Sequence, residues 1–171
     1  NFPRSMIPPW FNEGLAEYYH TFKIEDNRVV SLGLPLPSHL QLLQRYKMTS
    51  LRDLFAVSSY ELLQMKTDRR RVFYAQSWAL LHYLIQGGKG KGLGKFLDAL
   101  GRGVEAEKAF GEAFQMDYEQ MEKELRKYIN RASYNYSKVT LDEELSFDTK
   151  MRVIPVDEGE ANAYLGDLLF H

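Results

Sequence analysis

A mainly α-helical fold with one small β-hairpin and a short strand-rich tail is what this sequence predicts. Helical hydrophobic periodicity recurs along residues 1–133. Two capping boxes, at residues 58–61 and 117–120, each open an apolar-periodic segment. Only residues 21–32 alternate apolar and polar side chains around a turn signal, which favours a single hairpin.

The first helix is expected over residues 8–20, because proline has a fixed φ that suits the first helical turn. The hairpin that follows turns at Asp26 and Asn27, two residues that tolerate left-handed backbone. A proline-rich loop then leads into a helix over residues 38–46.

Residues 73–85 carry apolar side chains around nearly the whole helix circumference, which predicts a central, buried helix. The capping box at 58–61 opens a helix before it. One-faced helices are expected at 93–100 and 106–114, and the second capping box opens a last helix that ends near residue 131. The three arginines at 69–71 are expected at a solvated helix end.

The domain organisation follows from these patterns. Residues 1–133 form one helical lobe, and the short strand-like runs of 134–157 predict a linker or a small strand-rich cap. Residues 158–171 resume helical periodicity and resemble the first helix of a tetratricopeptide repeat. The chain begins at Asn1 and ends without a helix-stop signal, so we expect it to be a piece of a longer protein.

Composition excludes several classes of function. The chain of 171 residues is 44% hydrophobic and 26% charged, as in ordinary globular proteins. A net charge of −1 supplies no field that would steer it toward nucleic acid. The absence of cysteine excludes disulfides, thiolate metal ligands and a cysteine nucleophile. No apolar run approaches the roughly 20 residues needed to cross a bilayer, so no membrane span is predicted.

The segment PPWFNEGLAEYYH, residues 8–20, places a glycine inside the first helix. Glycine there costs roughly 0.5–1 kcal/mol relative to alanine, so we expect another backbone or a site to lie against Gly14. Glu13, Glu17 and His20 fall at i, i+4 and i+7 on one face of the same helix. That face carries side chains that commonly bind metals.

The segment resembles the third-ligand segment of the gluzincin zinc metallopeptidases, in which Trp-x-Asn-Glu-Gly-x-Ala follows a His-Glu-x-x-His helix. It is most similar to the bacterial peptidase-MA-like domain, which is often joined to tetratricopeptide repeats and shows something similar to FYAQSWALLHYL, residues 73–84. The resemblance implies the helical C-terminal lobe of a zincin-like peptidase domain. It also implies that Glu13 binds zinc in the intact parent. Glu17, one turn further on, is expected to orient the site or to lie on the surface, and not to bind the metal itself.

Aminopeptidases of this superfamily place a tyrosine at the start of a later helix. Tyr74 follows Glu13 by 61 positions, a spacing similar to that of the family. The resemblance implies that the Tyr74 hydroxyl is catalytic and donates to the oxyanion formed at the scissile carbonyl. The sequence departs from the aminopeptidases in having Gln76 and Ser77 where they have Lys-Gly.

Catalytic zinc needs three protein ligands and an open position for water. The four histidines of this chain do not include a pair four residues apart. In the family the His-Glu-x-x-His helix lies a short distance upstream of the tryptophan segment, so a chain that opens at Asn1 would not contain it. The chain alone is therefore expected to bind zinc no better than a generic carboxylate surface and to lack peptidase activity. A His-Glu-x-x-His sequence upstream of Asn1 would support an enzyme, and its absence would support a non-catalytic scaffold.

Other interpretations of the same residues stay open. Glu13 can be an ordinary helix-surface glutamate, and His82, inside the buried helix, is expected to be a hydrogen-bonded core residue. The Glu17-x-x-His20 spacing is that of di-iron bundles, but no second copy exists in the chain.

Two functions from different classes therefore remain. The first is a zinc-dependent peptidase, hydrolysing a peptide or protein substrate as exopeptidase or endopeptidase. The second is a non-catalytic, peptidase-derived scaffold that binds a protein partner through attached repeats. The resemblance is compatible with an exported or periplasmic bacterial protein, although the residues themselves specify no compartment and no oligomeric state.

Overall fold

The computed structural model describes residues 7–145, and within them the fold is mainly helical with a small antiparallel sheet, as the sequence predicts. The tetratricopeptide-like segment, 158–171, lies outside the described residues. The helices are α1 (Pro9–His20), α2 (Pro37–Arg45), α3 (Leu51–Ala56), α4 (Ser59–Gln64), α5 (Thr67–Gln86), α6 (Gly90–Gly101), α7 (Ala106–Phe114) and α8 (Tyr118–Tyr128). The strands are β1 (Lys23–Glu25), β2 (Val29–Leu32) and β3 (Ser137–Thr140).

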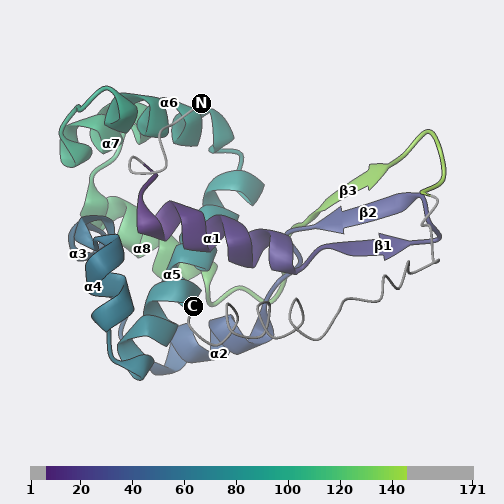
Figure 1. Ribbon diagram of the computed structural model, residues 1–171, viewed down its shortest axis with the longest axis horizontal. Coiled ribbons are helices and arrows are strands. Elements are labelled where there is room, and N and C mark those ends of the chain that lie inside the picture. The colour runs from purple at the N-terminus through teal and green to yellow at the C-terminus, as the bar shows by residue number, and fades with distance from the viewer. Residues whose placement is uncertain (1–6, 146–171) are drawn as a thin grey trace, which may run out of the picture.

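Helix α5 is the centre of the helical body, with α1 and α2 packed along it (Figure 1). Trp78 and Leu81 are fully buried and Leu84 is 1% exposed, which confirms the prediction of a central helix. The observed helix begins at Thr67, six residues before the predicted start. The hydrophobic pattern did not indicate this first part of the helix, because it is polar and lacks an apolar face. Among the described helices, none is both long and apolar enough to span a membrane.

Helices α1 and α5 approach each other closely at Gly14. A Cβ atom built there would lie 2.6 Å from the backbone oxygen of Ser77 and 3.4 Å from the Cβ of Leu81. The glycine therefore allows backbone to meet backbone, as its position in the sequence suggested. Further along, Gln86 Nε2 donates to the Tyr18 hydroxyl over 2.7 Å, so the two helices run side by side in the same direction.

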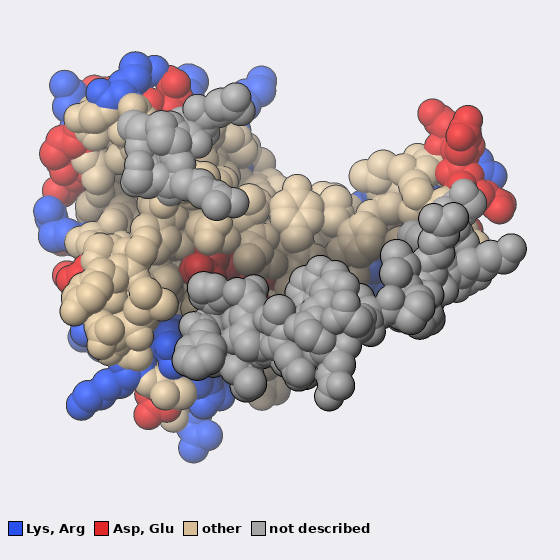
Figure 2. All heavy atoms as spheres, viewed as in Figure 1, with Lys and Arg blue, Asp and Glu red and all other residues tan. Residues whose placement is uncertain are grey.

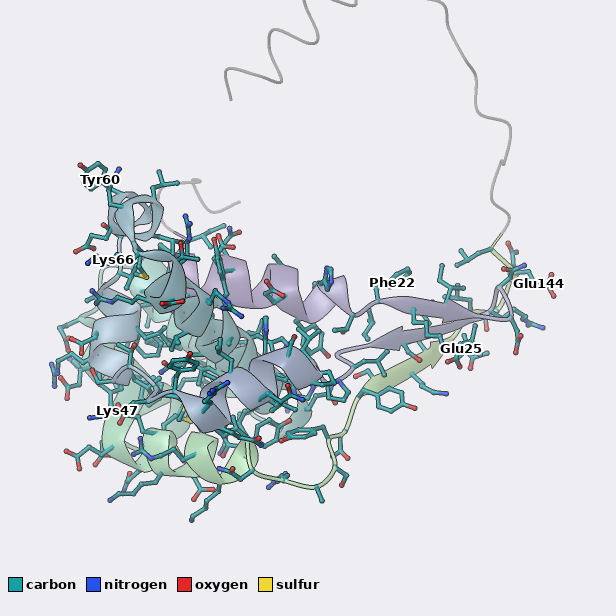
Figure 3. The ribbon with its side chains drawn as sticks, turned by 90° about the horizontal axis from the view of Figure 1, so that it is seen from below. Phe22, Glu25, Lys47, Tyr60, Lys66 and Glu144 are labelled. Atoms are coloured by element: carbon teal, nitrogen blue, oxygen red, sulfur yellow. The ribbon has the colours of Figure 1, made fainter. Side chains whose placement is uncertain are left out.

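The sheet has the order β1-β2-β3 and projects from the helical body as an arm (Figures 1 and 3). Asp26 and Asn27 have φ values of 51° and 53°, which confirms the left-handed turn expected between β1 and β2. Strand β3 pairs antiparallel with β2, Val139 opposite Val30. Part of the segment interpreted as a linker or cap is thus the third strand of the hairpin's own sheet.

Acidic side chains gather at the tip of this arm (Figure 2). They include Asp26 from the β1–β2 turn and Asp142, Glu143 and Glu144 after β3, all of them exposed. Figure 3 places Phe22 near the root of the arm, Glu144 at its tip and Tyr60 at the opposite end of the molecule. The cluster belongs to the arm alone and lies far from α4.

His82 joins the root of the arm to α8. Its Nε2 lies 2.7 Å from the carbonyl oxygen of Gly33, and its Nδ1 lies 2.6 Å from the Tyr128 hydroxyl. Because a carbonyl can only accept, Nε2 carries the proton, and the tyrosine hydroxyl donates to Nδ1. The side chain is fully buried and hydrogen-bonded, as expected for a core histidine.

Helix α3 is the element that the sequence analysis missed. It is six residues long, too short to show a helical hydrophobic period. Its N-terminus is held by two side chains: the Ser50 hydroxyl accepts from the backbone N–H of Asp53, and the Glu122 carboxylate of α8 accepts from that of Leu51. The second of these contacts is made by a residue distant in the sequence.

Replacing Gly14 with alanine should destabilise the fold by about 1–3 kcal/mol, the usual cost of an overpacked core, because the added methyl group would meet the α5 backbone. Urea unfolding would measure the loss. The matched control is Gly94→Ala on α6, where a Cβ meets no atom within 4 Å and should add about 0.5–1 kcal/mol of stability. Equal effects of the two substitutions would contradict the close helix contact.

His82 should make the protein less stable as the pH falls below neutral. Burial lowers the pKa of His82 below its ordinary value, partly opposed by the hydrogen bond to the Gly33 carbonyl. Below about pH 6.5 the unfolded chain therefore takes up a proton that the folded protein resists. Stability is fully present above that pH and declines toward the lower pKa of the folded state.

The change His82→Gln keeps one donor and one acceptor but removes the titration. Urea unfolding at pH 7.5 and pH 5 should show a smaller loss for this variant than for the wild type, by about 1.4 kcal/mol for each unit of pKa depression. His39, whose pKa burial also lowers, would account for part of the decline that remains. The same loss in both proteins would show that His82 does not carry the effect.

Candidate active-site cleft

A cleft of about 430 Å³ opens between the first turns of α1 and α5, with α4 along its rim. Helix α1 contributes a carboxylate to it, and α5 contributes a guanidinium and a phenol. Apolar side chains of α4 form the remaining wall. The lining residues are Ile7, Pro9, Asn12, Glu13, Ser59, Leu62, Leu63, Arg70 and Tyr74.

The structure brings together Glu13 and Tyr74, the two residues singled out as zinc ligand and oxyanion donor. Both line this one cleft, although 61 positions separate them in the sequence. The close contact at Gly14 sets this arrangement, because it fixes the register in which the parallel helices α1 and α5 lie together. Gly14 itself packs on α5, so the cleft lies beside that contact rather than against the glycine.

Glu13 keeps its carboxylate available. The side chain is partly buried, and the contact found for it is with Asn12 Nδ2, 3.4 Å from Oε1. No arginine, lysine or histidine of residues 7–145 forms an ion pair with it. Within the described residues, the carboxylate can therefore accept a cation without breaking an ion pair.

Tyr74 is a proton donor at neutral pH. Partial burial is the main reason that the pKa of its hydroxyl lies above the ordinary value, and the negative charge of Glu13 adds to the rise. The positive charge of Arg70 opposes it. A phenol with a raised pKa remains protonated, so it can donate a hydrogen bond to a developing negative charge.

Glu17 and His20 are not among the residues that line the cleft. Glu17 instead contacts α2, where its Oε2 lies 3.3 Å from Nε2 of His39. Burial lowers the pKa of His39, and the nearby carboxylate of Glu17 only partly offsets this. His20 is exposed at the end of α1. Of the three residues on that helix face, only Glu13 reaches the cleft.

Gln76 and Ser77, the departure from the aminopeptidase pattern, have structural roles. Gln76 is 1% exposed and forms two hydrogen bonds to the backbone of Thr49, accepting from its N–H over 2.8 Å and donating to its carbonyl over 2.7 Å. Ser77 is fully buried where α5 meets Gly14. The two residues therefore hold the loop before α3 and the α1–α5 contact.

A zinc ion would find one suitable carboxylate here. No cluster of three or more histidine, aspartate or glutamate side chains with metal-binding geometry occurs in the part of the chain that the structure describes. Glu13 has the chemistry and the accessibility of a single zinc ligand. It fits one of the three positions that a catalytic zinc site requires.

Arg70 is the cleft residue that the sequence analysis missed. Its two arginine neighbours are exposed, as expected for a solvated helix end, but Arg70 is partly buried and lines the cleft. It lies one turn before Tyr74 on α5, so the two side chains point to the same side of the helix. This i, i+4 spacing from Arg70 to Tyr74 is the sequence feature that could have identified Arg70 as a cleft residue.

A larger hollow of about 620 Å³ lies on the other side of α4, between α3 and the start of α5. Exposed charged and polar residues make up most of its lining, including Asp53, Glu61, Lys66 and Arg69. It contains none of the residues that the sequence analysis assigned to a site. The smaller cleft is therefore the better candidate for a functional site.

Comparison with known families places residues 2–103 in DUF1570, a family described as proteins of unknown function. The match covers more than half of the chain, and the chain belongs to this family. It includes α1, α4 and α5, and so all three walls of the cleft. Neither the curated proteins nor the solved structures contain a significant match.

Proposed function

We propose that this chain forms part of the active site of a zinc-dependent peptidase, which hydrolyses peptide bonds in a peptide or protein substrate. One observation carries the proposal: Glu13 and Tyr74, far apart in the sequence, line one cleft. The motif around each residue resembles the gluzincin peptidases independently of the other. Two unrelated resemblances would have no reason to converge on the same cleft.

Glu13 would bind the metal through its carboxylate, which forms no ion pair within residues 7–145. The other two ligands and the general base would come from outside the described residues. Zinc bound there would polarise the scissile carbonyl and lower the pKa of a water molecule for attack. The Tyr74 hydroxyl, which is protonated at neutral pH, would donate a hydrogen bond to the oxyanion that forms on the substrate.

A protein partner bound through the tetratricopeptide-like segment is a separate part of the proposal. That segment, 158–171, lies outside the described residues, so its support comes from the sequence alone. The cleft and the segment can be tested independently.

The natural full-length protein allows the two cleft roles to be separated. Glu13→Gln should lower the zinc content after dialysis, because the amide is a poorer metal ligand than the carboxylate. Tyr74→Phe should leave zinc content unchanged and lower kcat by about 10²–10³, the effect of losing one oxyanion donor. Metal analysis and hydrolysis of a peptide library would measure the two effects.

Tyr60→Phe is the matched control, because Tyr60 is 73% exposed on α4 and does not line the cleft. It should change neither zinc content nor kcat. Unchanged activity after Tyr74→Phe would show that Tyr74 does not stabilise the oxyanion. A full-length protein that holds no zinc and cleaves no peptide would contradict the peptidase proposal and favour the scaffold.

A further inference from the structure

Arg70 and Glu13 carry opposite charges on two walls of the same cleft without forming an ion pair within 4 Å. The other carboxylates of residues 7–145 do not pair with Arg70 either, and the side chain is only partly exposed. The guanidinium of Arg70 therefore lines the cleft without an ion pair to any carboxylate of the described residues.

The position of Arg70 on α5 strengthens this observation. A cation in the first turns of a helix lies at the positive end of the helix dipole, where an anion is favoured and a cation is not. The helix dipole therefore gives no reason for a partly buried arginine there. An anionic ligand would be attracted by both the guanidinium and the helix end.

The remaining wall is apolar and suits an aliphatic side chain. Leu62 is buried at its base, and Leu63 and Ile7 are 73% and 38% exposed at its edge. A ligand that fills the cleft would therefore place a carboxylate near Arg70 and an apolar group against α4. Arginine binds carboxylates through two parallel hydrogen bonds, which fixes the orientation of such a ligand.

We propose that Arg70 is the specificity-determining residue of the cleft and that the ligand is a peptide with a carboxylate beside an aliphatic side chain. This inference rests on the proposed function in taking a peptide as the ligand. The carboxylate belongs either to the C-terminus of the peptide or to an internal aspartate or glutamate. Both sources present the same group to the guanidinium.

Binding to the 171-residue chain tests the inference without any requirement for zinc or hydrolysis. Three acetylated peptides serve as probes in an NMR titration: Ala-Leu-Ala-Leu with a free C-terminal carboxylate, the same peptide as its amide, and Ala-Leu-Glu-Leu as its amide. The plain amide should bind at least about tenfold more weakly than a peptide with a carboxylate. Tighter binding of the first or of the third identifies the C-terminal or the internal source.

Arg70→Gln should remove this preference, so that all three peptides bind the variant alike. Arg70→Lys should restore part of it, because the charge returns without the paired donors. Arg71→Gln is the matched control, since it removes the same charge from the next, exposed position of α5 and should change affinity less than twofold. The NMR spectrum of each variant reports whether it is folded.

Equal binding of the three peptides to the wild-type chain would overturn the inference, as would a carboxylate preference that survives Arg70→Gln. These outcomes differ from failure of the peptidase proposal. A carboxylate preference that depends on Arg70, together with a full-length protein that neither binds zinc nor cleaves peptides, would support the inference and contradict the proposed function. Zinc-dependent peptide cleavage by the full-length protein, with no carboxylate preference that depends on Arg70, would support the proposed function and contradict the inference.

Discussion

The close contact between α1 and α5 at Gly14 is the constraint on which the rest of this structure depends. Without a Cβ at this position, the backbone of α1 can reach the Ser77 carbonyl of α5. On both sides of that point the two helices continue side by side. Toward their N-termini it sets Glu13 across the cleft from Tyr74, and toward their C-termini it sets Tyr18 beside Gln86.

A few buried polar side chains fix the segments that this contact does not reach. Gln76 holds the loop before α3 by both polar groups of the Thr49 backbone, and His82 connects the root of the arm to α8. Each of these side chains has its donor and its acceptor satisfied, so displacing either segment would leave a buried polar group unpaired. The arm and the cleft are thereby held by one rigid helix, α5.

Local patterns predicted much of this fold. The boundaries of α1, the turn at Asp26 and both capping boxes depend on residues that are neighbours in the sequence, and all of them are observed. The pairing of β3 with β2 and the capping of α3 from α8 could not be predicted in this way, because distant residues supply the partners. In the cleft, motif resemblance located Glu13 and Tyr74. Arg70 was not located, because it is the middle one of three consecutive arginines and only the folded structure shows that it is more buried than the other two.

The pairing of β3 with β2 also sets an order for folding. Strand β2 is the middle strand of the sheet, yet its second partner is more than a hundred residues away, beyond the eight helices of the described residues. During synthesis one edge of β2 would stay unpaired until β3 has been made, after the helical body. Pairing between strands so far apart in the sequence is intrinsically slow. A shortened chain that ended with α8 would keep that edge permanently open, and an unpaired edge invites the strand of another molecule.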